Sequence, residues 1–514
     1  MSFPSDYITA RTAFLAAAAA AGAEIRSHRH PLPGPAGEAL FLDVARLGPP
    51  DARRVLFLAS GTHGVEGLCG SGIQTFLLAD GLAARLPEGV ALVLVHAVNP
   101  WGFAWLRRVN EDNVDLNRNF LDHSAAHPEN PDYDRLDAVL NPRVLDEADV
   151  GAFLAAVEAF QSERGAEAAY RALSGGQYRH PAGVQYGGVT PAWSNRLLRR
   201  LWAEHAGRAE LAVFVDLHSG LGPRGVGLVL QTAAGDGTAA RLAQQWWPDV
   251  VRAEPGQGAD AALVSGLIGP AFVAALAPAA AVGVVLEFGT QPMSQVMLAV
   301  QADNWLHHHG ERDSERGRAV ARSMREAFFL DEADWQEAVC QRARAAVGDA
   351  LAGMAACAPA PVGAPRLRAA RPADRDVLVE FARAMAAETE GKSLDLAVLR
   401  AGTESLLADP GRGRVYVVEE DDRVVASLML TVEWSEWRNG YFWWIQSVYV
   451  DPAHRRRGFY RQLHEHVRAL AAADPEVCGL RLYVERENHA AQATYRAIGM
   501  FETDYLLFEE ACRR

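Results

Sequence analysis

The chain has 514 residues, of which 49% are hydrophobic, and it carries a formal net charge of −14. This length is enough for two or three domains with separate hydrophobic cores. The negative charge argues against a nucleic-acid partner, because neutralising phosphates needs a basic surface. No apolar run is long enough to cross a bilayer, so no membrane partner is expected.

The cysteines and the N-terminus together predict a cytoplasmic protein. The five cysteines are scattered without C-x-x-C spacing, which argues for a reducing compartment and against a cysteine metal site. The stretch "TAFLAAAAAAGAE", from Thr12 to Glu24, has the apolar centre of a secretory signal. It follows Asp6 rather than a basic segment, and alanine is a strong helix former, so we favour an ordinary first helix.

A change in composition predicts where the chain divides. The segment "ACAPAPVGAP", residues 356–365, alternates proline with small residues and reads as a linker. We therefore expect one domain over residues 1–355 and a second over residues 366–514, both of ordinary domain size.

The first domain alternates short apolar runs with helical patterns. The runs are "RRVLFLAS", "VALVLVHAVNP", "AVFVDLHSG", "GLVLQT" and "AVGVVLEFG". Strands this apolar are buried on both faces, which predicts an α/β fold with a mostly parallel sheet and helices on both faces. His63, His218 and Glu287 each fall at or just beyond the end of such a run, where open α/β sheets bind ligands.

These three residues, together with Glu66, form a candidate zinc site. His63 and Glu66 lie three residues apart in "SGTHGVEG", and His218 follows about 150 residues later. Two imidazoles and one carboxylate are a usual catalytic zinc set, with the fourth position left for water. Glu287 would then be the general base. Alone, His-x-x-Glu is more often a solvated turn or an ion-paired helix face.

The segment between the two histidines supplies candidate substrate ligands. It reads "NPWGFAWLRRVNEDNVDLNRNF" over residues 99–120. Asn117 and Arg118 in this segment could hold a substrate carboxylate, with the arginine making a paired, charge-assisted contact.

The ordered set "THGVE", "NPWG", "DLNRNF", "DLHSG" and "LEFGT" resembles the zinc carboxypeptidase family in the carboxypeptidase A-like sense. The resemblance covers roughly residues 5–300 and looks closest to a bacterial branch whose substrates are largely undefined. It implies that Asp115 orients His63 and that Arg108 stabilises the oxyanion of the scissile carbonyl. The adjacent Arg107 is an equal candidate for that second role.

One departure from this family affects the expected substrate. Its peptidases use a tyrosine between the last zinc histidine and the catalytic glutamate, and this chain has none from Ser219 to Leu286. The aspartoacylase-like members, which cleave N-acyl amino acids, do without it. The sequence therefore predicts hydrolysis of an amide near a free carboxylate, in a small molecule or a short peptide.

The second domain has a basic turn after an apolar strand. The segment "WWIQSVYVDPAHRRRGFYRQLHEHV", residues 443–467, runs from that strand into a helix. The dipole and backbone N–H groups at the helix start suit a pyrophosphate. Charge and close backbone approach would come from Arg455, Arg456, Arg457 and Gly458. A solvated basic surface is the plain alternative.

Together with "ENHAAQATYRAIGMFE", residues 487–502, this turn resembles the GNAT acetyltransferase superfamily over about residues 366–510. The resemblance implies a GNAT α+β fold that binds acetyl-CoA as co-substrate. Tyr495 would protonate the departing thiolate. The implied cofactor-binding residues are Val448 and Val450, whose backbone would pair with the pantetheine arm, the turn with Tyr460, and Asn488.

The acetyl acceptor and its base are less defined by sequence. Glu433 is the candidate general base, with an exposed charge at a strand end as the equal alternative. The same region holds Trp434, Trp437, Trp443 and Trp444. These side chains would either line an acceptor pocket or fill the core.

Three functions fit these patterns. The first is a bifunctional enzyme that hydrolyses an amide with zinc and transfers acetyl from acetyl-CoA to an amine, in sequence on one small metabolite. The second is a zinc amidohydrolase whose GNAT-fold domain senses acetyl-CoA. The third is a binding or scaffold protein with decayed sites, which a complete set of ligands and base disfavours. A homodimer is a weak expectation from how often enzymes form one.

Overall fold

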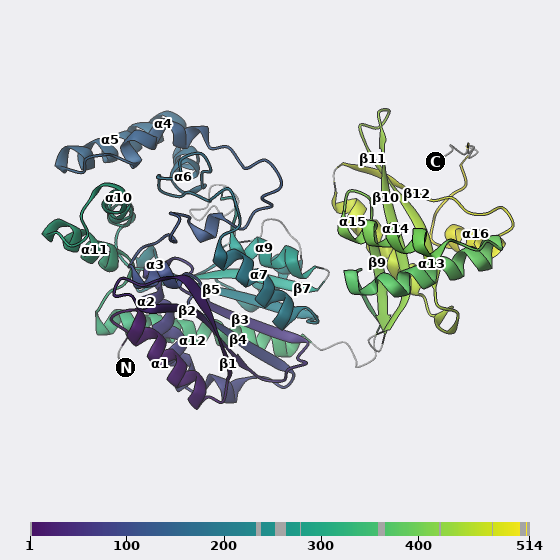
Figure 1. Ribbon diagram of the computed structural model, residues 1–514, viewed down its shortest axis with the longest axis horizontal. Helices are drawn as coiled ribbons and strands as arrows, with labels where there is room; N and C mark the ends of the chain where they lie inside the picture. The colour runs from purple at the N-terminus through teal and green to yellow at the C-terminus, as the bar shows by residue number, and fades with distance from the viewer. Residues whose placement is uncertain are drawn as a thin grey trace. The chain divides into compact units, whose positions relative to one another are not determined.

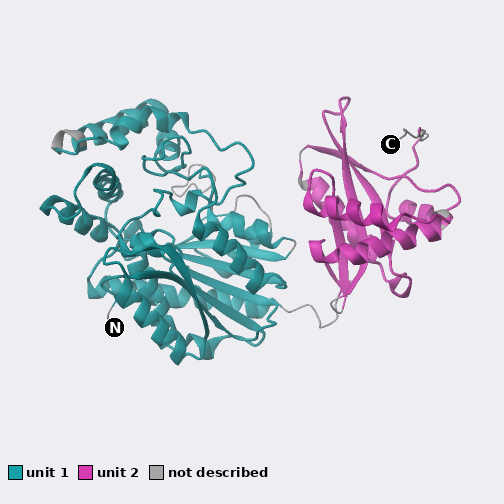
Figure 2. Ribbon diagram, in the orientation of Figure 1, with its two compact units in different colours: residues 1–359 teal, residues 360–514 magenta. Residues whose placement is uncertain are grey.

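The computed structural model describes residues 3–232, 238–251, 264–277, 279–357, 365–420, 423–474, 476–503 and 510. Contacts divide the chain into two compact units, residues 1–359 and 360–514 (Figure 2). The predicted linker falls at this division. Its first residue, Ala356, ends a long helix, and residues 358–364 lie outside the described part of the chain.

The first unit is built on a seven-stranded sheet with the order β1-β2-β4-β3-β5-β7-β6. The strands are β1 (Glu24–Pro33), β2 (Ala39–Leu47), β3 (Arg54–Ser60), β4 (Val90–His96), β5 (Leu211–Arg224), β6 (Gly227–Gln231) and β7 (Ala280–Gly289). The four central strands, β4, β3, β5 and β7, are parallel. The outer strands β1, β2 and β6 pair antiparallel, so the sheet is parallel only in its centre.

Helices cover both faces of this sheet (Figure 1). One face holds α1 (Tyr7–Ala20), α2 (Gly67–Ala79), α8 (Thr238–Trp246) and α12 (Ala333–Ala356), and the other holds α7 (Trp193–Ala206) and α9 (Ile268–Leu276). Successive side chains of β3 point alternately into the two hydrophobic cores on either face of the sheet. Leu56 and Leu58 pack with the first group of helices, whereas Phe57 packs with the second.

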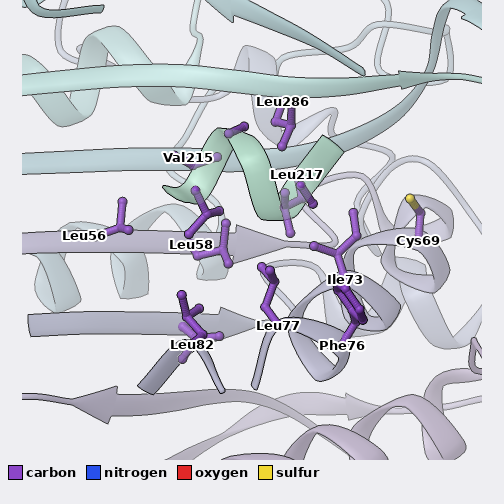
Figure 3. Packing of buried hydrophobic residues seen from close by; sticks show 14 of the residues in the cluster. Leu56, Leu58, Cys69, Ile73, Phe76, Leu77, Leu82, Val215, Leu217 and Leu286 are labelled. Carbon is purple, nitrogen blue, oxygen red and sulfur yellow. The ribbon is translucent and has the colours of Figure 1, made fainter. Parts of the chain in front are cut away.

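Figure 3 shows the first core, where the leucines of β3 meet Ile73 and Leu77 of α2. Each of these four side chains is fully buried. Burial of a leucine or isoleucine contributes about 1.5–3 kcal/mol relative to exposure. This packing fixes α2, whose N-terminus directly follows Glu66, against the end of β3.

A further group of helices packs near the carboxyl ends of the central strands. It comprises α3 (Pro100–Ala104), α4 (Pro131–Leu140), α5 (Glu147–Arg164), α6 (Ala166–Ser174), α10 (Met293–His309) and α11 (Glu315–Phe328). Helices α10 and α11 pack on each other and on β5, and α4, α5 and α6 form a small core of their own that Met297 of α10 joins. These helices therefore wall the region where the central parallel strands end (Figure 1).

The second unit has a five-stranded sheet with the order β12-β11-β10-β9-β8. Its strands are β8 (Arg366–Ala369), β9 (Arg414–Glu420), β10 (Arg423–Ser435), β11 (Gly440–Val450) and β12 (Val477–Arg481), and its helices are α13 (Arg375–Glu390), α14 (Leu396–Ala408), α15 (Phe459–Ala473) and α16 (His489–Ala497). Of the strand pairs described in this unit, β11 with β12 is parallel and the others are antiparallel. The predicted mixed α/β architecture, with a sheet-and-helix domain at the C-terminus, is confirmed.

Within the described residues, no helix combines the length and the hydropathy that a bilayer-spanning segment requires. Most of the alanine-rich segment near the N-terminus belongs to α1, and this helix packs Ala10, Phe14 and Ala18 into the first core. The predicted cytoplasmic location remains a prediction.

Candidate functional site

The turn after β3 requires its glycines. Gly61 has φ = +65°, a conformation that residues with a side chain rarely adopt. A Cβ on Gly64 would lie 2.0 Å from the backbone carbonyl carbon of Gly102 in α3. A hydrogen bond of 3.1 Å from the Gly64 N–H to the Arg108 carbonyl also holds the turn against the segment that follows α3. The sequence "SGTHGVEG" thus fixes where His63 points.

His63, Glu66 and His218 converge on one point. The Nδ1 atom of His63 lies 2.8 Å from Oε1 of Glu66, and the Nδ1 atom of His218 lies 2.9 Å from Oε2 of the same carboxylate. The two Nδ1 atoms are 3.2 Å apart. All three side chains are buried, and no other group of His, Cys, Asp or Glu in the described residues is arranged closely enough to share a metal ion.

A carboxylate holds the second nitrogen of each imidazole. Nε2 of His63 lies 3.1 Å from Oδ1 of Asp115, as the resemblance implied. Nε2 of His218 lies 2.9 Å from Oδ2 of Asp216, which also accepts a hydrogen bond from the Thr62 hydroxyl. Asp216 was not among the site residues predicted from the sequence. Its signal was present, because residues two apart on a strand share a face.

Glu287 lies beside His218, since the two are partners in the register of β5 and β7. Its Oε1 accepts a hydrogen bond of 3.0 Å from the Leu221 N–H. Burial, and then the nearby charge of Glu66, raise the pKa of Glu287 to about 7. The same cluster holds the pKa of Glu66 below its usual range because both histidines face it, although burial opposes this.

The two adjacent arginines have different environments. Arg108 lies at the cluster, with Nη1 3.2 Å from Oε1 of Glu66 and Nε 3.2 Å from Oδ2 of Asp115. Arg107 is buried elsewhere and pairs with Asp303 at 3.0 Å. Only Arg108 can reach a ligand at the cluster, which separates the two candidates that the sequence left equal.

Asn117 and Arg118 also reach the site. Arg118 is buried, and its Nε donates to the Ser174 carbonyl at 2.9 Å while its Nη1 donates to the Asn117 carbonyl at 2.8 Å. The Asn117 side chain accepts from the Ile268 N–H at the start of α9. The Asp115 carboxylate acts on the charge of Arg118, but among the described side chains its own ion pairs are with His63 and Arg108. A buried cation of this kind favours an anionic ligand.

A cavity of about 200 Å³ joins these groups. Its polar lining includes His63, Glu66, Arg108, Asn117, Arg118, His218 and Glu287. Helices α4, α5, α6 and α10 add an apolar wall that includes Leu140, Phe153, Leu173 and Met297. Tyr170 of α6 also lines the cavity, although it precedes the stretch in which the sequence analysis sought a tyrosine.

In the second unit, β11 continues beyond its neighbour. Register partners join β11 to β12 only as far as Trp444 and Arg481, where β12 ends. Among the described residues, no strand pairs on that side with the rest of β11, which contains Val448 and Val450, and we call this part its free edge. Backbone groups on such an edge can pair with an extended ligand.

The basic turn leads from β11 into α15. Arg456 has φ = +64° and Gly458 has φ = +87°, so the turn bends sharply before the helix begins at Phe459. Two of the three arginines are engaged within the unit. Arg455 pairs with Glu388 at 2.6 Å, and Arg457 pairs with Glu420 at 2.6 Å. The N–H groups at the start of α15 and the exposed Arg456 are therefore available to bind an anion.

The remaining predicted GNAT residues fall at two places. Tyr495 of α16 packs edge-on against Tyr460 of α15, with ring centroids 5.6 Å apart. Asn488 caps α16, since its side chain accepts from the Ala491 N–H at 3.1 Å. This cap is a structural role that the resemblance did not indicate, and cofactor binding by Asn488 remains a prediction.

Glu433 lies in the outer part of the β10–β11 hairpin. It pairs with Arg481 at 3.1 Å and accepts a hydrogen bond from the Trp444 indole N–H. Of the tryptophans left open by sequence, Trp443 is buried in the core, whereas Trp434 and Trp437 are exposed. The structure thus divides the tryptophans between core and surface, and Glu433 already has a cationic partner.

Two family models match the chain. One, described as "Protein of unknown function (DUF2817)", matches residues 3–342. The other, described as "Acetyltransferase (GNAT) family", matches residues 376–500, so the second unit is a GNAT acetyltransferase domain that uses acetyl-CoA. No curated protein matches the chain. The first model names no zinc carboxypeptidase, so that resemblance stays a prediction.

Solved structures also resemble part of the chain. A possible acetyltransferase from Clostridium difficile 630 is 44% identical, covers 29% of this chain and 99% of its own, and gives a TM-score of 0.28. A GCN5-related N-acetyltransferase from Ralstonia eutropha JMP134 is 24% identical, covers 28% and 98%, and gives 0.25. A predicted acetyltransferase from Clostridium acetobutylicum, solved with acetyl-CoA, is 17% identical, covers 28% and 96%, and gives 0.25.

Proposed function

The chain belongs to the DUF2817 family, whose function is unknown, and we propose that its first unit is a zinc-dependent amidohydrolase acting on an amide near a carboxylate. The observation that carries this proposal is the buried convergence of His63, Glu66 and His218 beside Glu287. Two imidazole nitrogens and one carboxylate match the donors of catalytic zinc sites.

The surroundings of these donors also suit zinc. Metal-bound histidines usually donate their second N–H to a carboxylate, and Asp115 and Asp216 occupy those positions here. Zinc held by this set would supply Lewis acidity toward a carbonyl and a water molecule. The fit rests on ligand type and proximity, which a solvated turn would not provide.

The chain's own residues then divide the remaining work. Glu287, which lies beside His218, can accept a proton and return it to a leaving amine. Arg108 can donate to the oxyanion that develops on the scissile carbonyl. Arg118 can hold the substrate carboxylate, which positions the amide between Arg108 and Glu287.

For the second unit, we propose that acetyl-CoA acetylates a small-molecule amine. The free edge of β11 supports binding of the pantetheine arm, and the start of α15 supports binding of the pyrophosphate. Tyr495 would protonate the departing thiolate. Together the two units make a bifunctional enzyme, and its cytoplasmic location and homodimeric state are parts of the same proposal.

The test is untargeted mass spectrometry on the purified full chain. It would be incubated with N-acyl amino acids, short peptides and a metabolite extract, with and without a zinc chelator and acetyl-CoA. We expect one compound to lose an acyl or amino-acid unit only with zinc. Loss of no compound, in protein shown to contain zinc, would count against hydrolysis of these amides.

Tyr495→Phe separates catalysis from sensing by the GNAT domain. We expect acetyl transfer to fall by about 10²-fold or more, because the general acid is lost. Binding of acetyl-CoA, measured by calorimetric titration, should stay unchanged, and hydrolysis should stay at its original rate. If the wild-type chain binds acetyl-CoA, transfers nothing and changes its hydrolysis rate, the acetyl-CoA-sensor alternative is correct.

Asp216→Asn tests the carboxylate behind His218. We expect zinc affinity to fall about 10–100-fold, because the imidazole loses a charged carboxylate acceptor and keeps at best a weaker, neutral amide oxygen. Competition with a chromophoric zinc chelator measures this change. The exposed Asp122→Asn serves as the control and should leave the affinity unaltered. Equal affinity in both variants would remove Asp216 from the metal centre.

A further inference from the structure

A second cavity lies within the GNAT unit, between helices α13 and α14 and one face of the sheet. Its volume is about 770 Å³. Its apolar lining includes Leu378, Phe381 and Met385 of α13, Leu399 and Leu406 of α14, and Met429 of β10. A cavity of this size inside a small domain has room for a ligand group of many atoms.

This cavity and α15 lie on opposite faces of the sheet. Leu428 and Leu430 of β10 pack with Phe459 and Leu463 of α15. Met429, between those two leucines, lines the cavity instead, because successive side chains alternate across a strand. In Figure 1, α13 and α14 cross one face of this sheet. A cofactor whose pyrophosphate lies at the start of α15 must therefore pass its acetyl end through the sheet to reach the cavity.

The free part of β11 offers that passage. Ser447 and Tyr449 line the cavity, and both lie beyond the last residue of β11 that pairs with β12. Ser447 has φ = +45° and lies where the register of β10 and β11 shifts. Within the described part of this unit, no strand covers β11 on the β12 side at the residues where the cavity begins.

The residues that line this cavity include no acidic side chain among those described. Their polar groups are the hydroxyls of serine, threonine and tyrosine side chains and the guanidinium of Arg412. The Tyr449 hydroxyl already donates to Glu388 at 2.9 Å, and Arg412 pairs with Asp409 at 3.2 Å. A cationic group placed against this wall would lose water without gaining a carboxylate partner among the lining residues. An apolar group would gain from burial.

We propose that this cavity is the acetyl-acceptor site and that its acceptor is a primary amine attached to a bulky apolar group. The proposal rests on the acetyl transfer proposed above. The neutral amine nitrogen attacks the acetyl carbon, forming the C–N bond as the C–S bond breaks. The nitrogen loses a proton, the thiolate of CoA gains one, and an N-substituted acetamide and free CoA result. The apolar wall favours the neutral amine that this step needs.

The first experiment compares amines as acceptors for the full chain, by following release of free CoA. We expect kcat/KM for 2-phenylethylamine and isoamylamine to exceed that for ethylamine, spermidine and glucosamine by about 30-fold or more, from burial of the apolar group. A higher value for spermidine or glucosamine would overturn the proposal. Acetyl-CoA binding without acetylation of any apolar amine would overturn it as well.

Two substitutions on α13 test the location. Met385→Glu places a carboxylate in the lining, and Ala387→Glu places the same charge on the exposed side of the helix. We expect Met385→Glu to lower kcat/KM for 2-phenylethylamine at least about 10-fold, and to raise it for spermidine, through burial and charge pairing. Ala387→Glu should leave both values unchanged. Equal effects from the two substitutions would place the acceptor elsewhere.

A third variant tests the cavity without introducing a buried charge that could disrupt folding. Ala382→Leu reduces the cavity without adding charge, so 2-phenylethylamine should lose more activity than ethylamine. Acetyl-CoA titration serves as the folding control for each variant. If the wild-type chain does not bind acetyl-CoA, the proposed acetyltransferase function fails. If it binds acetyl-CoA and the panel order is reversed, only the acceptor proposal fails.

Discussion

Glu287→Gln is expected to lower kcat for amide hydrolysis by about 10²–10⁴-fold, the usual range for loss of a general base. Glutamine keeps the shape of the side chain and can still accept the Leu221 N–H that now reaches Glu287. It cannot take a proton, so the loss should fall on kcat rather than on KM. Steady-state kinetics on the substrate found by mass spectrometry measure both constants.

Two controls make the Glu287 result specific. Zinc content, measured by inductively coupled plasma mass spectrometry, should be the same in wild type and variant, because Glu287 is not one of the three converging donors. Glu326→Gln, on the exposed surface of α11, should leave kcat unchanged. Hydrolysis at the wild-type rate in the Glu287 variant would assign the base to another group.

The sheet centre was predictable from sequence because its strands are buried on both faces. Phe57 and Leu58 point to opposite sides and are both fully buried, and β3 is apolar at every position from Val55 to Ala59, so it stands out in the chain. The edge strand β1 lacks this signal. β1 reads "EIRSHRHPLP" and is largely exposed, so nothing in its composition distinguished it from a loop.

The donor set was predictable for a related reason. His63 and Glu287 follow or end buried strands, and the carboxyl ends of neighbouring parallel strands meet at one edge of a sheet. What the sequence could not give was side-chain environment. Arg107 and Arg108 are identical in type and adjacent, and only tertiary packing sends Arg107 to Asp303. Likewise, Tyr170 reaches the cavity through the fold of α6.

In the GNAT unit, too, the sequence did not reveal which strands and side chains pair. The free edge of β11 follows from where β12 ends, and β12 is a short strand without an apolar run. Glu433 was selected as a base because it was expected to approach the acceptor side of the splayed strands, yet its partner Arg481 comes from a distant segment. Pairing of this kind depends on strand register, which local patterns do not encode.

Removal of zinc is expected to abolish amide hydrolysis and to leave acetyl transfer unchanged. His63, Glu66 and His218 all belong to the first unit, whereas the acetyl-CoA turn belongs to the second. Because zinc binds only the folded donor set, its removal should also lower the thermal stability of the first unit. Zinc present at 100 times its dissociation constant stabilises the fold by about 2.7 kcal/mol.

The measurement is differential scanning calorimetry with parallel assays, before and after dialysis against a chelator. We expect one transition to move down by several degrees and hydrolysis to return on adding zinc but not magnesium, which prefers oxygen ligands. His218→Ala is the matched control, since it lacks one donor and should respond little to the chelator. Full hydrolysis by protein that retains no metal would show that Glu287 and Arg108 act without zinc.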